Sequence, residues 1–349
     1  MSGKQWWKFS RRTFLAGLGS SAIALSLGGC GWMTKTLETA AKGNPPVIWI
    51  HGASCTGCSV SLLNSVDPPI QEVLLDIIEM KFHPTIMAAA GNAALAELDK
   101  IAANHQGEFF LVVEGGIPTG AGGMYCTMGH RGSHTSIFDH SSTNNDEITF
   151  QEAVVSLGKR AKAVIAAGVC ASNGGIPAGK PNPTQIVGVD QVVKETPIIN
   201  IPNCPMHPGR FLGTLAYVLT YNDVPTLDEE KRPVMFYEKS VHDLCPRKPF
   251  FIERQFAKEL GEAGCLLQLG CAGMAAMSDC AERKWNNGVN WCIEAGAPCI
   301  ACSNPKFPDV TSPFYEKYVA YLKENEIEFL AQLQSAIRNG KPFGEVVRV

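Results

Sequence analysis

Short apolar runs alternate with helical patterns along the first two thirds of the chain. The apolar runs are almost free of polar residues, are too short for helices, and lie at residues 47–50, 109–113, 163–166 and 197–201. Helical periodicity occupies residues 92–104, 150–161 and 208–221, and helical segments are also expected between the first run and Met80. Short unbroken apolar runs are typical of strands that are buried on both faces of a parallel sheet. The alternation therefore predicts an α/β fold, with parallel strands joined by right-handed crossovers.

Cysteines follow three of the four predicted strands. Cys55 and Cys58 come after the first strand, Cys170 after the third and Cys204 after the fourth. Because the loops after parallel strands converge on one edge of the sheet, we expect these four thiols to be neighbours. Four thiolates suit a tetrahedral zinc site or a cubane iron-sulfur cluster, and the spacing does not choose between them. A disulfide between Cys55 and Cys58 is the alternative, but it leaves Cys170 and Cys204 unexplained.

From about residue 222 onward the apolar periodicity is lost and proline, glycine and charged residues dominate. This stretch holds eight further potential ligands: His242, Cys245, Cys265, Cys271, Cys280, Cys292, Cys299 and Cys302. Metal-ligand bonds can stabilise a region that lacks a large apolar core. We therefore interpret the stretch as a second cysteine-rich region with two metal centres.

The composition narrows the function classes. Thirteen cysteines in 349 residues are too many for chance and too dispersed for a small disulfide-bonded domain. A net charge of −3 without long runs of one sign argues against a nucleic-acid or anionic-membrane partner. Setting aside Cys30 and Cys126, the latter expected to be a buried free thiol, eleven cysteines and one histidine provide twelve ligands for three four-iron clusters. Three such centres on one chain indicate an electron relay.

The first thirty residues have the pattern of an export signal. Arg11 and Arg12 precede an apolar run at residues 14–29, which is short for a membrane-spanning helix. The arginine pair resembles a twin-arginine signal, whose route exports proteins that are already folded. Residues 27–30 resemble a lipobox that would place a lipid on Cys30, with ordinary signal cleavage as the alternative. No later apolar run reaches eighteen residues, so the mature chain is expected in the periplasm, attached to a membrane only through such a lipid.

Seven ordered motifs resemble the small subunit of nickel-iron hydrogenases over residues 47–314. They are Cys55-Thr56-Gly57-Cys58-Ser59, Glu114-Gly115, Gly168-Val169-Cys170-Ala171, Asn203-Cys204-Pro205, Val241-His242-Asp243-Leu244-Cys245-Pro246, Leu269-Gly270-Cys271 and Pro298-Cys299-Ile300-Ala301-Cys302-Ser303. The resemblance implies a flavodoxin-like, doubly wound domain at residues 46–222, then a mostly irregular cysteine-rich domain at residues 223–315. Residues 316–349 look helical and lie outside the resemblance.

The resemblance also assigns ligands. It implies a proximal 4Fe-4S cluster on Cys55, Cys58, Cys170 and Cys204, and a distal 4Fe-4S cluster on His242, Cys245, Cys265 and Cys271. It implies a middle cluster on Cys280, Cys299 and Cys302. Cys292 stands where most members carry proline and bind a 3Fe-4S cluster, so a fourth thiolate here permits a full cubane. That residue and residues 284–292 resemble the nickel-iron-selenium subgroup, whereas Gly57 and Gly175 stand where oxygen-tolerant members carry two extra cysteines.

The implied function is electron transfer in a hydrogenase. Hydrogen would be split at a nickel-iron centre in a separate large subunit, so no catalytic residue is expected on this chain. The expected partners are that large subunit, in a heterodimer, and a periplasmic cytochrome that accepts the electrons. The alternatives are an iron-sulfur subunit of a quinone-linked oxidoreductase, a stand-alone electron carrier and a zinc-stabilised binding module.

Overall fold

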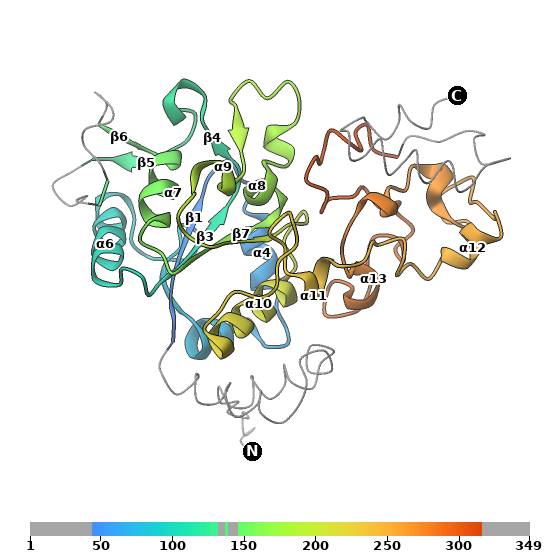
Figure 1. Cartoon of the computed structure of the whole chain (residues 1–349), viewed down its shortest axis with the longest axis horizontal. Helices are drawn as coiled ribbons and strands as arrows, with labels where there is room; N and C mark the ends of the chain where they lie inside the picture. Colours follow the sequence, from blue (N-terminus) through green and yellow to red (C-terminus); the bar gives the residue numbers. More distant parts are fainter. Residues whose placement is uncertain (1–43, 132–136, 139–145, 316–349) are drawn as a thin grey trace, which may run out of the picture.

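The computed structural model describes residues 44–131, 137–138 and 146–315. The expected signal segment with Cys30 and the expected C-terminal helices at residues 316–349 lie outside these ranges. Within the described ranges, no helix is both long enough and apolar enough to span a membrane. Figure 1 shows a domain built on a central sheet, with a second, loop-rich region beside it that contains α11, α12 and α13.

The central sheet has five parallel strands. In spatial order they are β2 (Glu79–Phe82), β1 (Pro46–His51), β3 (Phe110–Glu114), β7 (Ala163–Ala167) and β9 (Ile198–Ile201). Every pair of neighbours runs parallel, which confirms the predicted α/β class. The edge strand β2 is a correction, because its sequence was expected to be helical through Met80. This strand is short and partly exposed, so it lacks the apolar run that identified the other four.

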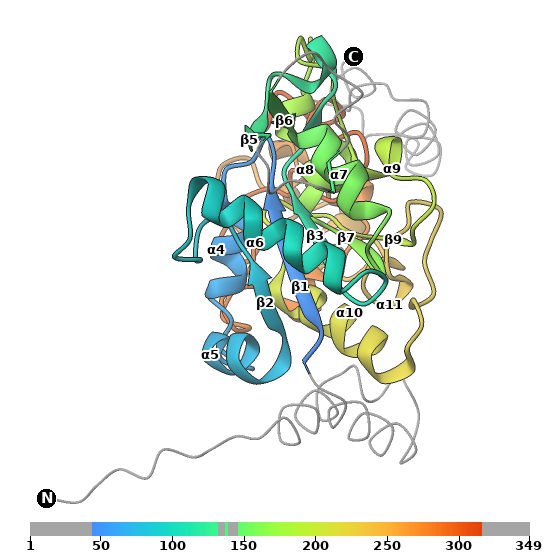
Figure 2. The ribbon, with the colours of Figure 1, turned by 90° about the vertical axis from the view of Figure 1, so that its left-hand side faces the viewer.

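Helices cover both faces of the sheet, and alternate side chains of the strands supply the two cores. Ile48 and Ile50 of β1 pack in one core with α6 (Gly91–Asn104) and α7 (Phe150–Gly158). Figure 2 shows these two helices in front of the strands. Val47 and Trp49 face the other core, which includes α4 (Gly57–Leu63) and α10 (Pro208–Tyr221). The doubly wound arrangement leaves the carboxyl ends of the strands free to carry ligands.

Short elements fill the connections of the first domain. They are α5 (Ile70–Glu72), the π-helix η1 (Val73–Ile77), β4 (Ile117–Pro118), η2 (Gly120–Gly123), β5 (Thr127–His130), β6 (Glu147–Thr149), α8 (Gly168–Asn173), η3 (Ile176–Ala178), β8 (Ile186–Val187) and α9 (Val189–Val192). Two antiparallel pairs, β4 with β8 and β5 with β6, form small ribbons apart from the main sheet.

The cysteine-rich region is mostly irregular, as the sequence predicted. Its helices have three to five residues: α11 (Val234–Tyr237), α12 (Lys248–Ile252), η4 (Leu266–Leu269), η5 (Gly273–Ala275) and α13 (Cys280–Arg283). A third apolar core, which includes Val241, Leu266 and Trp291, lies among the candidate ligands. Helix α10 ends at Tyr221, and Asn222 follows it in a left-handed conformation. This ending lies at the predicted domain boundary, which itself stays a prediction.

Candidate metal centres

Four candidate ligands lie in loops at the carboxyl edge of the sheet. Cys55 follows β1, Cys58 lies in the first turn of α4, Cys170 lies in α8 after β7, and Cys204 follows β9. Burial raises the pKa of Cys58 well above its usual value, and the charges of Glu114, Cys170 and Cys204 raise it further. Burial also raises the pKa of Cys170 to about 12, with smaller contributions from Cys204 and Cys55. The structure therefore brings these four thiols together, at a site where free thiolates repel one another and a bound metal would offset that repulsion.

Glycines leave room for the four sulfur atoms. A Cβ atom on Gly168, whose φ is +84°, would lie 2.5 Å from the Cys58 sulfur. A Cβ atom on Gly175 would lie 2.9 Å from the Cys170 sulfur, and one on Gly57 would lie 3.0 Å from the Cys55 sulfur. Because Gly168 and Gly175 have positive φ as well, any larger residue there would strain the backbone and crowd a thiol.

A buried carboxylate fixes the loop that holds Cys58. Glu114, at the end of β3, is 1% exposed. Six hydrogen-bond contacts converge on it: Trp49 Nε1 (3.0 Å), Ser54 Oγ (3.1 Å), Cys58 N (3.0 Å), Ser59 N (3.1 Å), Ser59 Oγ (2.5 Å) and His51 Nε2 (3.1 Å). Burial alone would raise the pKa of Glu114, but hydrogen bonds from His51 and Ser59 lower it to about 2. The carboxylate therefore stays ionised and holds the first turn of α4 in place.

The sequence singled out Glu114 only as part of a motif and did not predict this role. The available signal was an acidic residue at the end of an unbroken apolar strand, where an unpaired charge would be costly. Such a residue needs several donors nearby, but the sequence does not say which segments supply them. Here they come from β1 and from the loop that carries the first cysteine pair.

The middle set of thiols gathers around Cys280, the first residue of α13. Burial and then Cys280 raise the pKa of Cys302 to about 12. Burial raises the pKa of Cys299, and Cys271, Cys302 and Cys280 contribute in turn. Cys292 has a raised pKa through burial and then through Cys280. The fourth cysteine of the predicted middle set is therefore close to Cys280 and lines the same cavity as the other three.

In the predicted distal set, the three thiols lie together but the histidine ring is not shown to join them. Burial raises the pKa of Cys265 to about 12, with contributions from Cys271 and Cys245, so these three thiols are neighbours. The His242 backbone amide donates to the Gly273 carbonyl at 3.1 Å, and a Cβ atom on Gly273 would lie 3.6 Å from the Cys271 sulfur. The His242 ring packs edge-on against Phe251, with 4.7 Å between the ring centroids. The backbone of His242 thus lies near Cys271, while its ring contacts an aromatic neighbour.

The three sets are adjacent to one another. Cys204 of the first set contributes to the raised pKa of Cys302, and Cys271 of the distal set contributes to that of Cys299. A cavity of about 740 Å³ opens where the first domain meets the cysteine-rich region. The thiol-bearing residues that line it are Cys204, Cys280, Cys292, Cys299 and Cys302. The thiols therefore form a continuous row rather than three isolated groups.

The donor chemistry limits what these sets can bind. Soft thiolate donors select zinc, copper(I) or iron-sulfur clusters. Among the residues that the structure describes, no group of three histidine, cysteine or acidic side chains could hold a single metal ion. Cys126 lies apart from the three sets and packs against the first core.

Comparisons with known proteins match both halves of the chain. The family described as the C-terminal part of the NiFe/NiFeSe hydrogenase small subunit matches residues 237–315, and the family described as NADH ubiquinone oxidoreductase, 20 Kd subunit, matches residues 55–218. The chain is 41% identical over 328 residues to the periplasmic [NiFeSe] hydrogenase small subunit of Desulfomicrobium baculatum, covering 88% of this chain and 98% of that protein. It is 41% identical over 314 residues to the periplasmic [NiFe] hydrogenase small subunit 1 of Nitratidesulfovibrio vulgaris, covering 88% and 93%.

A solved structure supports the same relationship. The crystal structure of a reduced, active form of the Ni-Fe-Se hydrogenase from Desulfomicrobium baculatum has a TM-score of 0.72 and 41% identity. That match covers 79% of this chain and the whole of the compared chain.

Proposed function

The chain belongs to the family of nickel-iron and nickel-iron-selenium hydrogenase small subunits, and from this premise we propose that it relays electrons through three 4Fe-4S clusters. Cys55, Cys58, Cys170 and Cys204 would hold the proximal cluster, His242, Cys245, Cys265 and Cys271 the distal cluster, and Cys280, Cys292, Cys299 and Cys302 the middle cluster. The observation that carries the proposal is the row of thiols, in which Cys302 neighbours Cys204 and Cys299 neighbours Cys271.

When bound, a 4Fe-4S cluster takes up and releases single electrons. The protein's part is to hold the clusters close to one another and to set their potentials through burial and through hydrogen bonds to sulfur. Met206 N donates to the Cys58 sulfur at 3.3 Å, and Ala301 N lies 3.4 Å from the Cys299 sulfur. These backbone donors favour the negatively charged, reduced state of the clusters that the two sulfurs would bind.

The large subunit of the hydrogenase is the partner that the family implies, and we propose that it covers the proximal end of the row. Cys55 and Cys204 are exposed in this chain, and the exposed apolar residues Val60 and Val66 line the same cavity as Cys204. Exposed apolar side chains around candidate ligands suit a permanent interface between subunits. The nickel-iron centre and its chemistry belong to that partner, and this chain supplies the path for the electrons.

We further propose that the protein works in the periplasm, as the names of its relatives say of them. The paired Arg11 and Arg12 support export by the twin-arginine route, and Cys30 is the proposed site of a lipid. A periplasmic cytochrome is the proposed electron acceptor at the distal end. The quinone-linked alternative draws only on the match of the first domain and leaves the match of residues 237–315 unexplained.

The cluster assignment is tested by iron and sulfide analysis with low-temperature electron paramagnetic resonance of the oxidised enzyme. The natural protein is expected to contain about twelve irons per small subunit and no 3Fe-4S signal. Cys292→Pro is expected to gain a stoichiometric 3Fe-4S signal because the middle cluster loses its fourth thiolate. Cys126→Ala is the matched control, since this thiol lies outside the three sets, and its iron content should not change.

Two results would contradict the assignment. A stoichiometric 3Fe-4S signal in the natural protein would remove Cys292 from the ligands and leave the hydrogenase relay intact. Zinc in place of iron would overturn the relay itself.

A further inference from the structure

Arg210 carries a charge that is completely removed from solvent. It lies in the first turn of α10 and is 0% exposed. Its guanidinium forms an ion pair with Asp279 at 2.7 Å and donates to Asn203 Oδ1 at 2.5 Å. The guanidinium also contacts a sulfur atom, since Nη2 donates to Cys280 Sγ at 3.2 Å. A buried guanidinium in contact with a candidate ligand is an unusual use of charge, since buried charges are costly unless they are paired.

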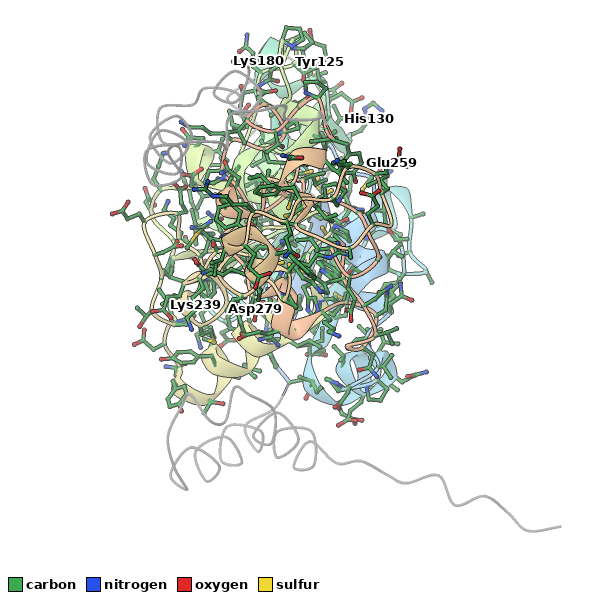
Figure 3. All side chains as sticks on the ribbon, turned by 90° about the vertical axis from the view of Figure 1, so that its right-hand side faces the viewer. Tyr125, His130, Lys180, Lys239, Glu259 and Asp279 are labelled. Atoms are coloured by element: carbon green, nitrogen blue, oxygen red, sulfur yellow. The ribbon has the colours of Figure 1, made fainter. Side chains whose placement is uncertain are left out.

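The ion pair does not neutralise the site. Asp279 is shared, because Arg283 also binds it through Nε and Nη2, each at 2.8 Å from Oδ2. Two guanidinium groups and one carboxylate leave one net positive charge next to Cys280. Figure 3 labels Asp279 near Lys239, whose carbonyl accepts from Ser278 N, the residue before Asp279.

The same arrangement orients an amide toward a second sulfur. Asn203 Oδ1 accepts from Arg210 and also from the Tyr237 hydroxyl at 3.3 Å, so its Nδ2 group points the other way. That Nδ2 donates to Cys302 Sγ at 3.6 Å. The Tyr237 ring also packs on the guanidinium, with 5.4 Å between Arg210 Cζ and the ring centroid. Arg210 therefore acts on Cys280 directly and on Cys302 through Asn203.

We propose that Arg210 raises the reduction potential of the middle cluster, offsetting the fourth thiolate that Cys292 adds. The proposal rests on the assignment of Cys280, Cys292, Cys299 and Cys302 as the ligands of that cluster. Reduction adds one negative charge to the cluster, and a cation that donates to a ligand sulfur stabilises the added charge. The interaction is strong because Arg210 is buried, where charges are screened much less than in water.

The test is a redox titration of the two-subunit enzyme, followed by electron paramagnetic resonance of each cluster. Arg210→Gln is expected to shift the midpoint potential of the middle cluster downward and to leave the proximal and distal clusters unchanged. Asp279→Asn removes the countercharge but leaves Arg210 in place, so it is expected to shift the same potential upward. An effect of charge shifts the middle-cluster potential in opposite directions in these two variants. General loosening of the site would shift it in the same direction in both.

Two further variants make the comparison specific. Arg210→Lys keeps the positive charge but has fewer N–H donors. The potential of its middle cluster should therefore lie between those of the natural protein and Arg210→Gln. Arg131→Gln makes the same substitution at a half-buried arginine paired with Glu152, in the first domain, and should leave all three potentials unchanged. If Arg210→Gln fails to fold, Asp279→Asn and Arg210→Lys still test the direction of the shift.

Unchanged middle potentials in the loaded Arg210 and Asp279 variants, or shifts in the same direction, would overturn the proposal. Failure of the cluster assignment would look different. It would appear in the natural protein, as a missing middle cluster or as a middle cluster that survives loss of the Cys280 thiol.

Discussion

Two buried charges, Glu114 and Arg210, fix the surroundings of the candidate ligands at the scale of single residues. Each has several polar partners, and each contacts a candidate ligand residue: Glu114 accepts from the Cys58 amide, and Arg210 donates to the Cys280 sulfur. The sequence predicted the candidate cysteines because some of them follow three of the four predicted strands and the others gather within residues 245–302. It did not predict Glu114 or Arg210 as partners of the ligands, because a single charged residue carries no spacing pattern and its partners lie far away in the chain.

Replacement of Glu114 tests the role of its carboxylate. In Glu114→Gln the amide nitrogen would face donors such as Trp49 Nε1 and Ser59 N, which would then lose their acceptor. A buried donor without a partner is costly, so we expect the free energy of unfolding to fall by at least about 2 kcal/mol. Denaturant unfolding of the loaded protein measures this change.

Glu108→Gln is the control for that variant, because the Glu108 side chain is mostly exposed and pairs with His105 at the surface. Its stability should stay within about 0.5 kcal/mol of the natural protein. Equal losses of unfolding free energy in the two variants would show that the hydrogen bonds to Glu114 add no more stability than a surface ion pair.

Turns after the strands, rather than the strands themselves, set the positions of the proximal thiols at the scale of elements. The turn from β7 into α8 begins at Gly168, which lies directly beside the Cys58 sulfur of another element. The sequence predicted that β7 is followed by a cysteine loop, but not that this glycine makes room for a thiol from the first loop. A lack of sequence signal also explains why β2 was expected to be helical. This short edge strand contains Glu79 and Lys81 and has too little apolar pattern to be distinguished from the end of a helix.

Gly168→Ala is therefore expected to exclude the proximal cluster. The added methyl group would lie 2.5 Å from the Cys58 sulfur, so that thiol would have to move. Iron content should fall by about four atoms per small subunit, the content of one cubane, with loss of the proximal resonance signal.

Gly122→Ala provides the comparison, because Gly122 has a similar φ of +66° but no atom within 4 Å of an added Cβ. It carries only backbone strain of about 1 kcal/mol and should keep its full iron content. If both variants lost iron equally, strain rather than crowding of the thiol would be responsible.

The whole molecule has two large cores around the sheet and a third, smaller core among the cysteines of the second region. Apolar periodicity stops near residue 222, where the sequence predicts a domain boundary. The sequence could not predict how the two regions contact each other, since Arg210 with Asp279 and Asn203 with Cys302 join residues far apart in the chain.

Removal of the clusters is expected to loosen the two regions unequally. Under the proposed cluster assignment, metal-ligand bonds stabilise the cysteine-rich region, so its amide protons should exchange faster once a chelator and an oxidant have removed the iron. The strands β1, β3 and β7 are buried on both faces and should keep their protection. Hydrogen exchange of the full chain with mass spectrometry measures both, and equal loss in both regions would contradict the prediction.

His207 adds a dependence on pH where the two regions meet. Its ring accepts from Gly209 N and contacts the Lys284 carbonyl at 2.7 Å, so it joins α10 to the cysteine-rich region. Burial, followed by the charges of Arg210 and Arg283, lowers the pKa of His207 to about 3. The folded protein keeps this ring neutral while an unfolded chain protonates it below pH 6.5. Its contribution to stability is therefore complete above pH 6.5 and decreases as the pH falls toward 3.

His207→Gln should weaken that dependence. One histidine accounts for up to about 1.4 kcal/mol per pH unit, so between pH 6.5 and 5 the natural protein should lose about 2 kcal/mol more than the variant. Unfolding measured at the two pH values gives the difference directly, and equal losses would mean that His207 is protonated without cost in the folded state.

The order of the ligands along the chain also imposes an order on biosynthesis. Cys55 emerges early, but the first set of thiols is complete only when Cys204 has left the ribosome. By then Asn203 is also present, and Arg210 follows six residues after Cys204, before any cysteine of the second region has been made. Asn203 and Arg210, which contact the sulfurs of Cys302 and Cys280, are therefore synthesised before these two cysteines. Under the proposed cluster assignment, a polypeptide that stopped between Cys204 and Cys302 would carry all four proximal ligands but only an incomplete middle set.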